Sequence, residues 1–300
     1  MNIFTLKTKN YSKQTIILKT ILKNNKLTAT INHRGAELIS LENNNQRDYI
    51  WNGNPEFWGK HSPVLFPIVG TLKNNLFHYK NQEYHLPRHG FARDMDFELV
   101  ESTAEKAVFL LSYNSETLKN YPFEFQLQLI YTLAETKLSI SYHVCNTGIN
   151  TMPFSIGAHP AFALPESFES YEVEFEQTEP LQYHLLENDL VSTETKKLNT
   201  RNNKIALDYT LFEHDALIFK TILSKQLTIL EHNRPLLKVD YEGFPNLGIW
   251  TKNAAAFICI EPWYGYSDVL DSSNDLFQKE GIQILESKSR FQAAFSIEIL

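Results

Sequence analysis

The 300-residue sequence has little of several features that mark common classes of protein. It contains only 11 glycines and two cysteines, and it has no C-x-x-C, H-E-x-x-H or G-x-S-x-G motif and no glycine-rich phosphate loop. These absences argue against the nucleotide, metal and serine-hydrolase sites that such motifs build. We therefore expect a protein without a cofactor and without a metal.

Long apolar runs and excess positive charge are also absent. No apolar stretch approaches the roughly 20 residues that a membrane span needs. The early "TIILKTIL" segment is interrupted by Lys19 and lacks a small-residue cleavage pattern, so it does not resemble a signal peptide. The net charge of −7 argues against nucleic acid or an anionic membrane as the main partner.

The two cysteines, Cys145 and Cys259, lie in apolar stretches that read as strands. Such positions favour buried free thiols in a reducing compartment over a disulfide. We therefore expect a cytoplasmic protein.

Alternation of apolar and polar residues with period two dominates the rest of the chain. It occurs in "KLTATIN" (26–32), "FQLQL" (125–129), "KLSISYHV" (137–144), "YEVEFEQ" (171–177) and "FSIEIL" (295–300). The runs "DALIF" (215–219) and "AAAFICI" (254–260) are almost wholly apolar, as strands covered on both faces are. Only "SETLKN" (115–120) indicates a helix. The pattern predicts an all-β fold: one large antiparallel β-sandwich over residues 20–300, with few short helices, after a lead-in of residues 1–19.

Polar residues stand at the ends of several predicted strands. In "LPRHGFARD" (86–94), His89 precedes Gly90 and lies near Arg88, Arg93 and Asp94; a surface turn with a local ion pair would explain the same residues. In "FSIGAHPAFALP" (154–165), His159 lies among small residues, where a hydrogen-bonded core histidine is the alternative.

Two carboxylates complete this set. Glu261 ends a buried strand in "ICIEPWYGYSD" (258–268) and is followed by Trp263, an aromatic wall on which the C–H face of a sugar could pack. A buried carboxylate is costly unless it is paired or used. Asp215 opens the "DALIF" run and could equally start that strand from a turn. Two histidines and two carboxylates without a metal motif suit general acid–base catalysis on a polar, uncharged ligand.

Five segments in order resemble the aldose 1-epimerase (galactose mutarotase) family, with its LacX-like branch as the nearest match. They are "HSPVLFPIVG" (61–70), "LPRHGFARD" (86–94), "MPFSIGAHPAF" (152–162), "LFEHDALIF" (211–219) and "CIEPWYGYSD" (259–268). The resemblance covers about residues 20–300. It implies the galactose mutarotase-like β-sandwich and the cofactor-independent interconversion of the α and β anomers of an aldohexose.

The resemblance also implies a role for each candidate residue. His159 would be the general acid that protonates the ring oxygen O5, and Glu261 the general base that takes the proton from the C1 hydroxyl. His89 and Asp215 would bind sugar hydroxyls. We expect His159 and Glu261 to face each other across a sugar-sized gap, with Gly157 and its small neighbours leaving room for the ring.

One departure from the family pattern concerns the basic residue near the sugar. Many relatives have an arginine after the "FP-x-x-G" turn, whereas here Gly70 is followed by Thr71, Leu72 and Lys73. Lys73 or Arg93 would have to substitute, although a lysine does not reproduce the guanidinium fork.

Three other functions stay open. The first is a hexose-6-phosphate epimerase of the same superfamily. This function would be favoured if two of the basic residues Arg88, Arg93 and Lys73 lie beside the site. If they instead pair with nearby carboxylates, a neutral aldose is favoured. The second is a non-catalytic sugar-binding or sensing protein, although binding alone needs no acid and base. The third, a glycosidase, would need two opposed carboxylates, and Glu261 has only Asp215. In each case the partner is a small sugar, and we expect a monomer or weak homodimer.

Overall fold

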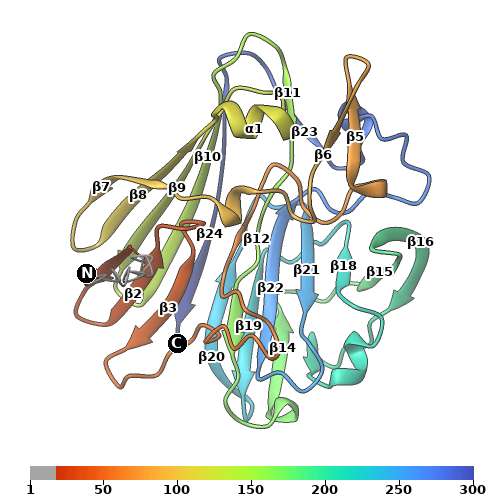
Figure 1. Cartoon of the computed structure of the whole chain (residues 1–300). Coiled ribbons are helices and arrows are strands. Elements are labelled where there is room, and N and C mark those ends of the chain that lie inside the picture. Colours follow the sequence, from red (N-terminus) through yellow and green to blue (C-terminus); the bar gives the residue numbers. More distant parts are fainter. Residues whose placement is uncertain (1–17) are drawn as a thin grey trace, which may run out of the picture.

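The computed structural model describes residues 18–300, and most of the expected lead-in, residues 1–17, lies outside them. Two large antiparallel sheets dominate the fold (Figure 1). The first contains, in spatial order, β17 (Lys204–Ala206), β14 (Tyr171–Phe175), β19 (Gln226–Glu231), β20 (Arg234–Asp240), β24 (Arg290–Ile299), β10 (Lys137–Asn146), β9 (Phe125–Ala134), β8 (Lys106–Ser112) and β7 (Glu98–Ser102).

The second large sheet has eight strands. Its order is β16 (Leu190–Lys197), β15 (Gln182–Glu187), β18 (Leu217–Phe219), β21 (Asn246–Trp250), β22 (Phe257–Tyr264), β12 (Ile156–Ala158) and β4 (Val64–Leu65), with β13 (Ala161–Ala163) also pairing with β22. Smaller sheets are formed by β1 (Lys19–Lys23), β2 (Leu27–Asn32) and β3 (Leu38–Asn43), by β5 (Leu76–Tyr79) and β6 (Gln82–His85), and by β11 (Met152–Phe154) and β23 (Gln283–Leu285).

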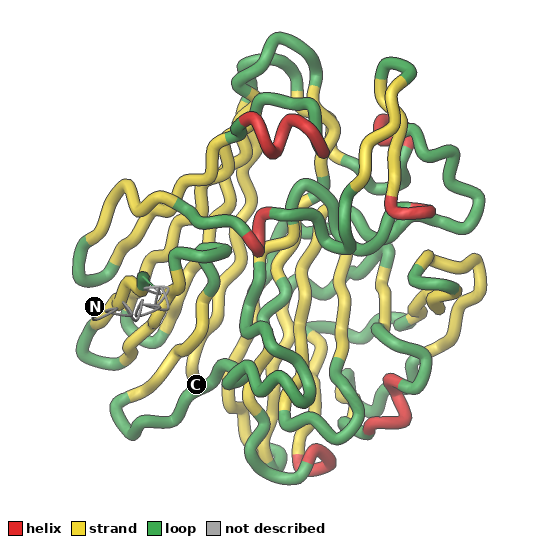
Figure 2. Tube along the Cα trace, in the orientation of Figure 1, coloured by secondary structure: helices red, strands yellow, loops and turns green. Residues whose placement is uncertain are grey.

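Helical structure in residues 18–300 is short and peripheral (Figure 2). The one α-helix, α1 (Ser115–Asn120), begins at the predicted position because the Asn114 side chain accepts the backbone N–H groups of residues 116 and 117. Five 3₁₀ turns cover Lys73–Asn75, Ala92–Asp94, Phe168–Ser170, Tyr209–Phe212 and Leu276–Gln278. No helix in this part of the chain has the length and apolar composition that crossing a membrane requires.

The hydrophobic core lies between the two large sheets. Strand β10 shows how the sequence builds it: Leu138, Ile140, Tyr142 and Val144 are buried, while the residues that alternate with them are partly exposed. They belong to one cluster with Val173 on β14 and Leu247 on β21. The predicted β-sandwich is thus confirmed, and both cysteines are free thiols as expected, although Cys145 is only partly buried.

Candidate active site

Strand β22 is buried on both faces, and its alternation places the candidate site. Ile258 and Ile260 face the core between the sheets, whereas Cys259 and Trp263 belong to clusters on the opposite face, the side from which Glu261 opens to a cavity. The cavity has a volume of about 530 Å³, within the range of small-molecule sites. It is lined by His159, Glu261, His89, Asp215, Arg93 and Trp263, that is, by all but one of the predicted site residues.

Trp263 forms part of the cavity wall, and two glycines make room for its indole. A Cβ atom on Gly157 of β12 would lie 2.4 Å from Trp263 Cδ1, and one on Gly248 of β21 would lie 2.3 Å from Trp263 Cη2. Both strands neighbour β22. The expectation that Gly157 leaves room for a sugar ring is therefore wrong, because the indole fills that space. Trp263 Nε1 donates a hydrogen bond to Ala158 O at 3.2 Å, which holds the ring in place.

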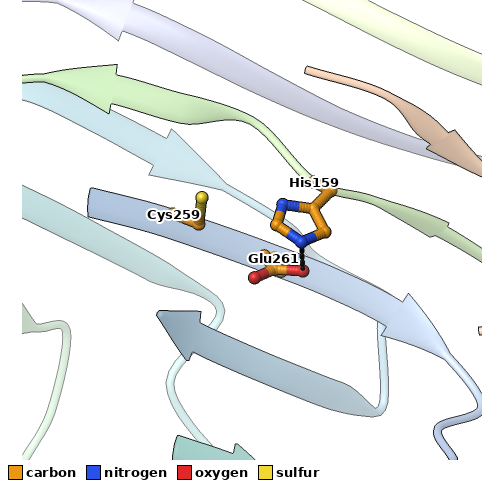
Figure 3. Close-up of side chains that lie close together, drawn as sticks. All are labelled: His159, Cys259 and Glu261. Atoms are coloured by element: carbon orange, nitrogen blue, oxygen red, sulfur yellow. Dashed lines mark ion pairs between the residues drawn. The ribbon is translucent and has the colours of Figure 1, made fainter. Parts of the chain in front are cut away.

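His159 lies between β12 and β13, and Figure 3 shows its imidazole pointing at the Glu261 carboxylate. His159 Nε2 is 3.2 Å from Glu261 Oε2. The expected sugar-sized gap between the two groups is wrong, because adjacent strands of one sheet bring them into direct contact. Within residues 18–300, neither Glu261 Oε2 nor His159 Nδ1 has a partner with hydrogen-bond geometry. Buried polar atoms of this kind are normally satisfied, so both are available to a ligand.

Burial moves the pKa values of the pair in opposite directions. It lowers the pKa of His159 to about 3, and the nearby Arg93 and Arg88 act in the same direction. Burial raises the pKa of Glu261 well above its ordinary value, while the Arg88 charge partly opposes this shift. Both shifts follow from burial, which disfavours the charged form of each group. The neutral imidazole and the protonated carboxyl together carry one proton, the same number as an imidazolium beside a carboxylate.

Aromatic rings enclose His159. The Trp58 indole stacks on the imidazole, with 4.7 Å between ring centroids and 25° between planes. Trp250 and His89 meet it edge to face, at 5.8 Å and 5.6 Å. These contacts fix the orientation of the ring.

A hydrogen-bond donor faces each ring nitrogen of His89. Gly70 N–H donates to His89 Nδ1 at 3.1 Å, and Arg88 Nε–H donates to His89 Nε2 at 3.4 Å. Burial, followed by the charges of His159 and the two arginines, lowers the pKa of His89 well below its ordinary value, so the ring is neutral. A neutral imidazole has a single acceptor nitrogen, so the two donors compete for it, and the shorter backbone contact favours Nδ1. In that tautomer His89 Nε2 carries the proton and is a donor.

Arg88 and Arg93 line the cavity, and each also contacts a carboxylate. Arg88 Nη1 lies 3.0 Å from Asp189 Oδ1, and Arg88 Nη2 lies 3.9 Å from Asp215 Oδ2. Arg93 Nη2 donates to Arg88 O at 2.8 Å, and Arg93 Nε lies 3.7 Å from Asp94 Oδ2. The local ion pair that the sequence allowed as an alternative thus exists, but at the wall of the cavity.

Lys73 is the exception among the predicted site residues, since it does not line the cavity. Its ammonium donates to Ser272 O at 3.3 Å, and its backbone N–H donates to Asp268 Oδ2 at 2.9 Å. The loop after Gly70 turns its side chain away, so the expectation that Lys73 replaces the family arginine is wrong in this structure.

Several cavity residues were not identified from the sequence. Trp58 and Phe57 come from the segment between β3 and β4, and Trp250 and Lys252 from the end of β21. The signal available for Phe57 and Trp58 was that two aromatic residues stand side by side in the otherwise polar segment "NPEFWGK" (54–60). Nothing local marks Trp250, because its strand reads as ordinary core.

Three neighbouring side chains of the site are of the types that bind metal ions. Ligand atoms of His159, Cys259 and Glu261 lie within 4.8 Å of one another, and Figure 3 shows all three. Burial, followed by the Glu261 charge, raises the pKa of the Cys259 thiol well above its ordinary value. Cys259 packs in an apolar cluster with Trp51 and Phe257. A thiol held protonated in such surroundings is a poor ligand, since metals bind the thiolate.

Comparison with known proteins identifies the family. The family model described as Aldose 1-epimerase matches residues 19–282. The plasmid-encoded protein LacX of Lactococcus lactis is 34% identical over 294 residues, which cover 93% of this chain and 98% of LacX.

Solved structures similar to this one include two from lactobacilli. The galactose mutarotase related enzyme of Lactobacillus acidophilus has a TM-score of 0.90 and 34% identity, covering 94% of this chain and 97% of the other. A galactose mutarotase-like protein of Lactobacillus casei has a TM-score of 0.89 and 30% identity, covering 94% and 100%. The chain belongs to the aldose 1-epimerase family.

Proposed function

We propose that this protein is a cofactor-independent aldose 1-epimerase, an isomerase that interconverts the α and β anomers of an aldohexose. The observation that carries the proposal is the buried contact between His159 Nε2 and Glu261 Oε2 in the wall of a cavity. Burying an acid and a base together is costly, and such pairs cluster at functional sites. Family membership supports the same reaction.

The short separation suits this chemistry. The ring oxygen O5 and the hydroxyl oxygen O1 are both bonded to C1, so an acid and a base that lie side by side reach both oxygens at once. His159 gives a proton to O5 while Glu261 takes the proton of the C1 hydroxyl, and the C1–O5 bond breaks. Rotation about C1–C2 and closure with the roles reversed yields the other anomer.

The proton balance of the pair fits a reversible reaction. The two groups hold one proton between them before the ring opens, on His159, and one after it opens, on Glu261. Each state differs from the other only in the position of that proton, and no covalent intermediate is needed. The shifted pKa values favour the neutral pair in the free protein, with the proton on Glu261, so this proton must pass to His159 before the ring opens.

Other cavity residues supply binding. In the tautomer with Nδ1 as the acceptor, the Nε2–H group of His89 is a donor for a sugar oxygen, and the Asp215 carboxylate accepts hydroxyl protons. Trp263 offers an apolar face to the C–H groups of the ring. These roles leave His159 and Glu261 free for proton transfer.

A hexose 6-phosphate is the second candidate substrate, because three cationic side chains line the cavity. Besides Arg88 and Arg93 these include Lys252, whose ammonium donates to Phe57 O at 3.0 Å. A phosphate would have to compete with Asp189 and Asp215 for Arg88 and with Asp94 for Arg93. These pairs favour the neutral sugar as the first candidate.

Polarimetry tests both candidates. Freshly dissolved α-D-glucose and α-D-galactose should reach anomeric equilibrium faster with the protein than without it, and the 6-phosphates are assayed in parallel. A phosphate that reacts much faster than either neutral sugar would make the second candidate correct. Binding of sugars without any acceleration would instead identify a non-catalytic sugar-binding protein and overturn the proposal.

A further inference from the structure

A buried ion pair lies behind the cavity and outside the proposed chemistry. Lys279 Nζ is 3.0 Å from Asp268 Oδ1, and their side chains are 2% and 3% exposed. The Lys279 ammonium also donates to Tyr266 O. Removing two charges from water is expensive, and a hydrophobic pair of similar volume often stabilises a fold equally well. The pair therefore calls for a role that apolar residues could not fill.

Asp268 connects this pair to the loop that begins at Gly70. Its Oδ2 atom accepts the backbone N–H of Lys73 at 2.9 Å, and its own N–H donates to Thr71 O at 2.8 Å. The neighbouring Ser267 Oγ accepts the Thr71 N–H at 2.9 Å. Two consecutive residues after β22 thus hold three polar backbone groups of the loop.

The loop is packed so closely that it has little freedom to shift. A Cβ atom on Gly70 would lie 2.1 Å from Ser267 Oγ, and Gly70 has a φ of +73°. Only glycine combines this backbone conformation with this approach. The position of Ser267 and Asp268 therefore decides where the Gly70 peptide lies.

The same peptide holds His89. Gly70 O accepts the backbone N–H of His89 at 2.7 Å, while Gly70 N–H donates to the His89 Nδ1 atom at 3.1 Å. The second bond favours the tautomer in which Nδ1 is the acceptor, against the competing Arg88 Nε–H at Nε2. A displaced loop would remove this constraint on the ring.

We propose that Asp268 and Lys279 are positioning residues that fix the tautomer and orientation of His89 through the Gly70–Lys73 loop. Lys279 holds the Asp268 carboxylate, the carboxylate holds the loop, and the loop makes His89 a donor at Nε2. The inference rests on the proposed function only in assigning that donor to a sugar oxygen; the control of the tautomer stands independently of turnover.

The test combines ¹⁵N NMR of the histidine rings with titration of equilibrated galactose. In the unaltered protein, His89 should show an unprotonated Nδ1 and a protonated Nε2. In Asp268→Ala, both tautomers should appear, and the Kd for galactose should rise about fivefold to tenfold, as the loss of one oriented hydrogen bond predicts. KM should rise more than kcat falls, because His89 binds and does not transfer the proton.

Two further variants keep the test decisive. Asp268→Asn combined with Lys279→Met removes both charges but retains an amide oxygen for the Lys73 N–H, so it should restore most of the His89 tautomer and most of the affinity. If Asp268→Ala does not fold, this double variant is measured in its place. The matched control, Val239→Ala, shortens a fully buried side chain in the nine-stranded sheet and should lower stability without changing either readout.

The outcomes separate this inference from the proposed function. Asp268→Ala with the original His89 tautomer and an affinity within twofold would overturn the inference, whatever the turnover. A double variant that binds no better than Asp268→Ala would contradict the stated route through the Lys73 N–H. Absence of turnover in the unaltered protein would refute the epimerase proposal alone, since the NMR readout does not depend on it.

Discussion

His159 Nε2 lies 3.2 Å from Glu261 Oε2, and the two side chains are 9% and 2% exposed. They come from adjacent parts of one sheet, the turn after β12 and the middle of β22, so the contact depends on strand pairing and not on a flexible loop. Two titratable groups held this close behave as one unit with a shared proton.

The opposite pKa shifts of this pair predict how stability depends on pH. Below about pH 4.5 the unfolded chain binds one proton more, on His159, because the folded pKa of that group is about 3 instead of 6.5. The contribution of the pair to stability should therefore rise with pH in this range. Above about pH 6.5 the folded protein binds one proton more, on Glu261, whose folded pKa is raised from 4.5, so the contribution should fall. Between about pH 4.5 and pH 6.5 the contribution of the pair to stability should not change with pH.

Denaturant unfolding at a series of pH values measures this contribution. The difference in unfolding free energy between the unaltered protein and the double variant His159→Asn/Glu261→Gln isolates the pair. A difference that increases steadily with pH through pH 8 would contradict the raised pKa of Glu261.

Trp58 should support turnover through its stack on His159. The indole face would stabilise the imidazolium form from which His159 protonates O5, and such contacts contribute about 0.5–1.5 kcal/mol. Trp58→Ala should lower kcat by about threefold to tenfold, while Trp58→Phe, which keeps a ring at the same place, should retain most of it. Polarimetry at saturating sugar measures the effect. Unchanged kcat in Trp58→Ala would show that the ring only packs against the histidine.

A chelator should not affect the activity. The protonated Cys259 thiol makes the group of His159, Cys259 and Glu261 a poor metal site, and the proposed reaction uses the two side chains without a ligated ion. Cys259→Ala should keep most of its turnover. Loss of activity in EDTA that zinc restores, together with an inactive Cys259→Ala, would identify a metal centre instead.

His159→Asn distinguishes a catalytic histidine from a core one. As the general acid, its loss should lower turnover by about 10²–10⁴-fold. The double variant with Glu261→Gln should be little worse than the worse single variant, because both groups act in one proton exchange. A core role predicts the reverse, a lower melting temperature with nearly normal turnover per folded molecule. Calorimetry and polarimetry on the same samples separate the two.

Much of the fold could be predicted because one physical signal, alternation with period two, is local. It located β2, β10, β14 and β24, and the segment "SETLKN" located α1, whose start the Asn114 cap explains. The sequence did not show that β22 continues beyond the apolar run (254–260) to Tyr264, because the end of a strand depends on its pairing, here with β12 and β21.

The site residues could be predicted by type but not by geometry. The direct contact of His159 with Glu261 depends on which strands are neighbours in the sheet, and a single sequence does not show this. Gly157 was assigned to the sugar because its partner across the strands, Trp263, was unknown. Lys73 was assigned to the cavity because the path of its loop was unknown: only the structure shows that its backbone N–H donates to Asp268 and that its side chain does not line the cavity.

The turnover of folded Glu261→Gln tests the central claim most directly. The substitution keeps the size of the side chain and removes the carboxylate that is proposed to take the C1 hydroxyl proton. Initial rates on fresh α-D-galactose, divided by the folded fraction from circular dichroism, should fall by about 10²–10⁴-fold. A folded variant that keeps most of its turnover would contradict the assignment of Glu261 as the base and, with it, the proposed mechanism.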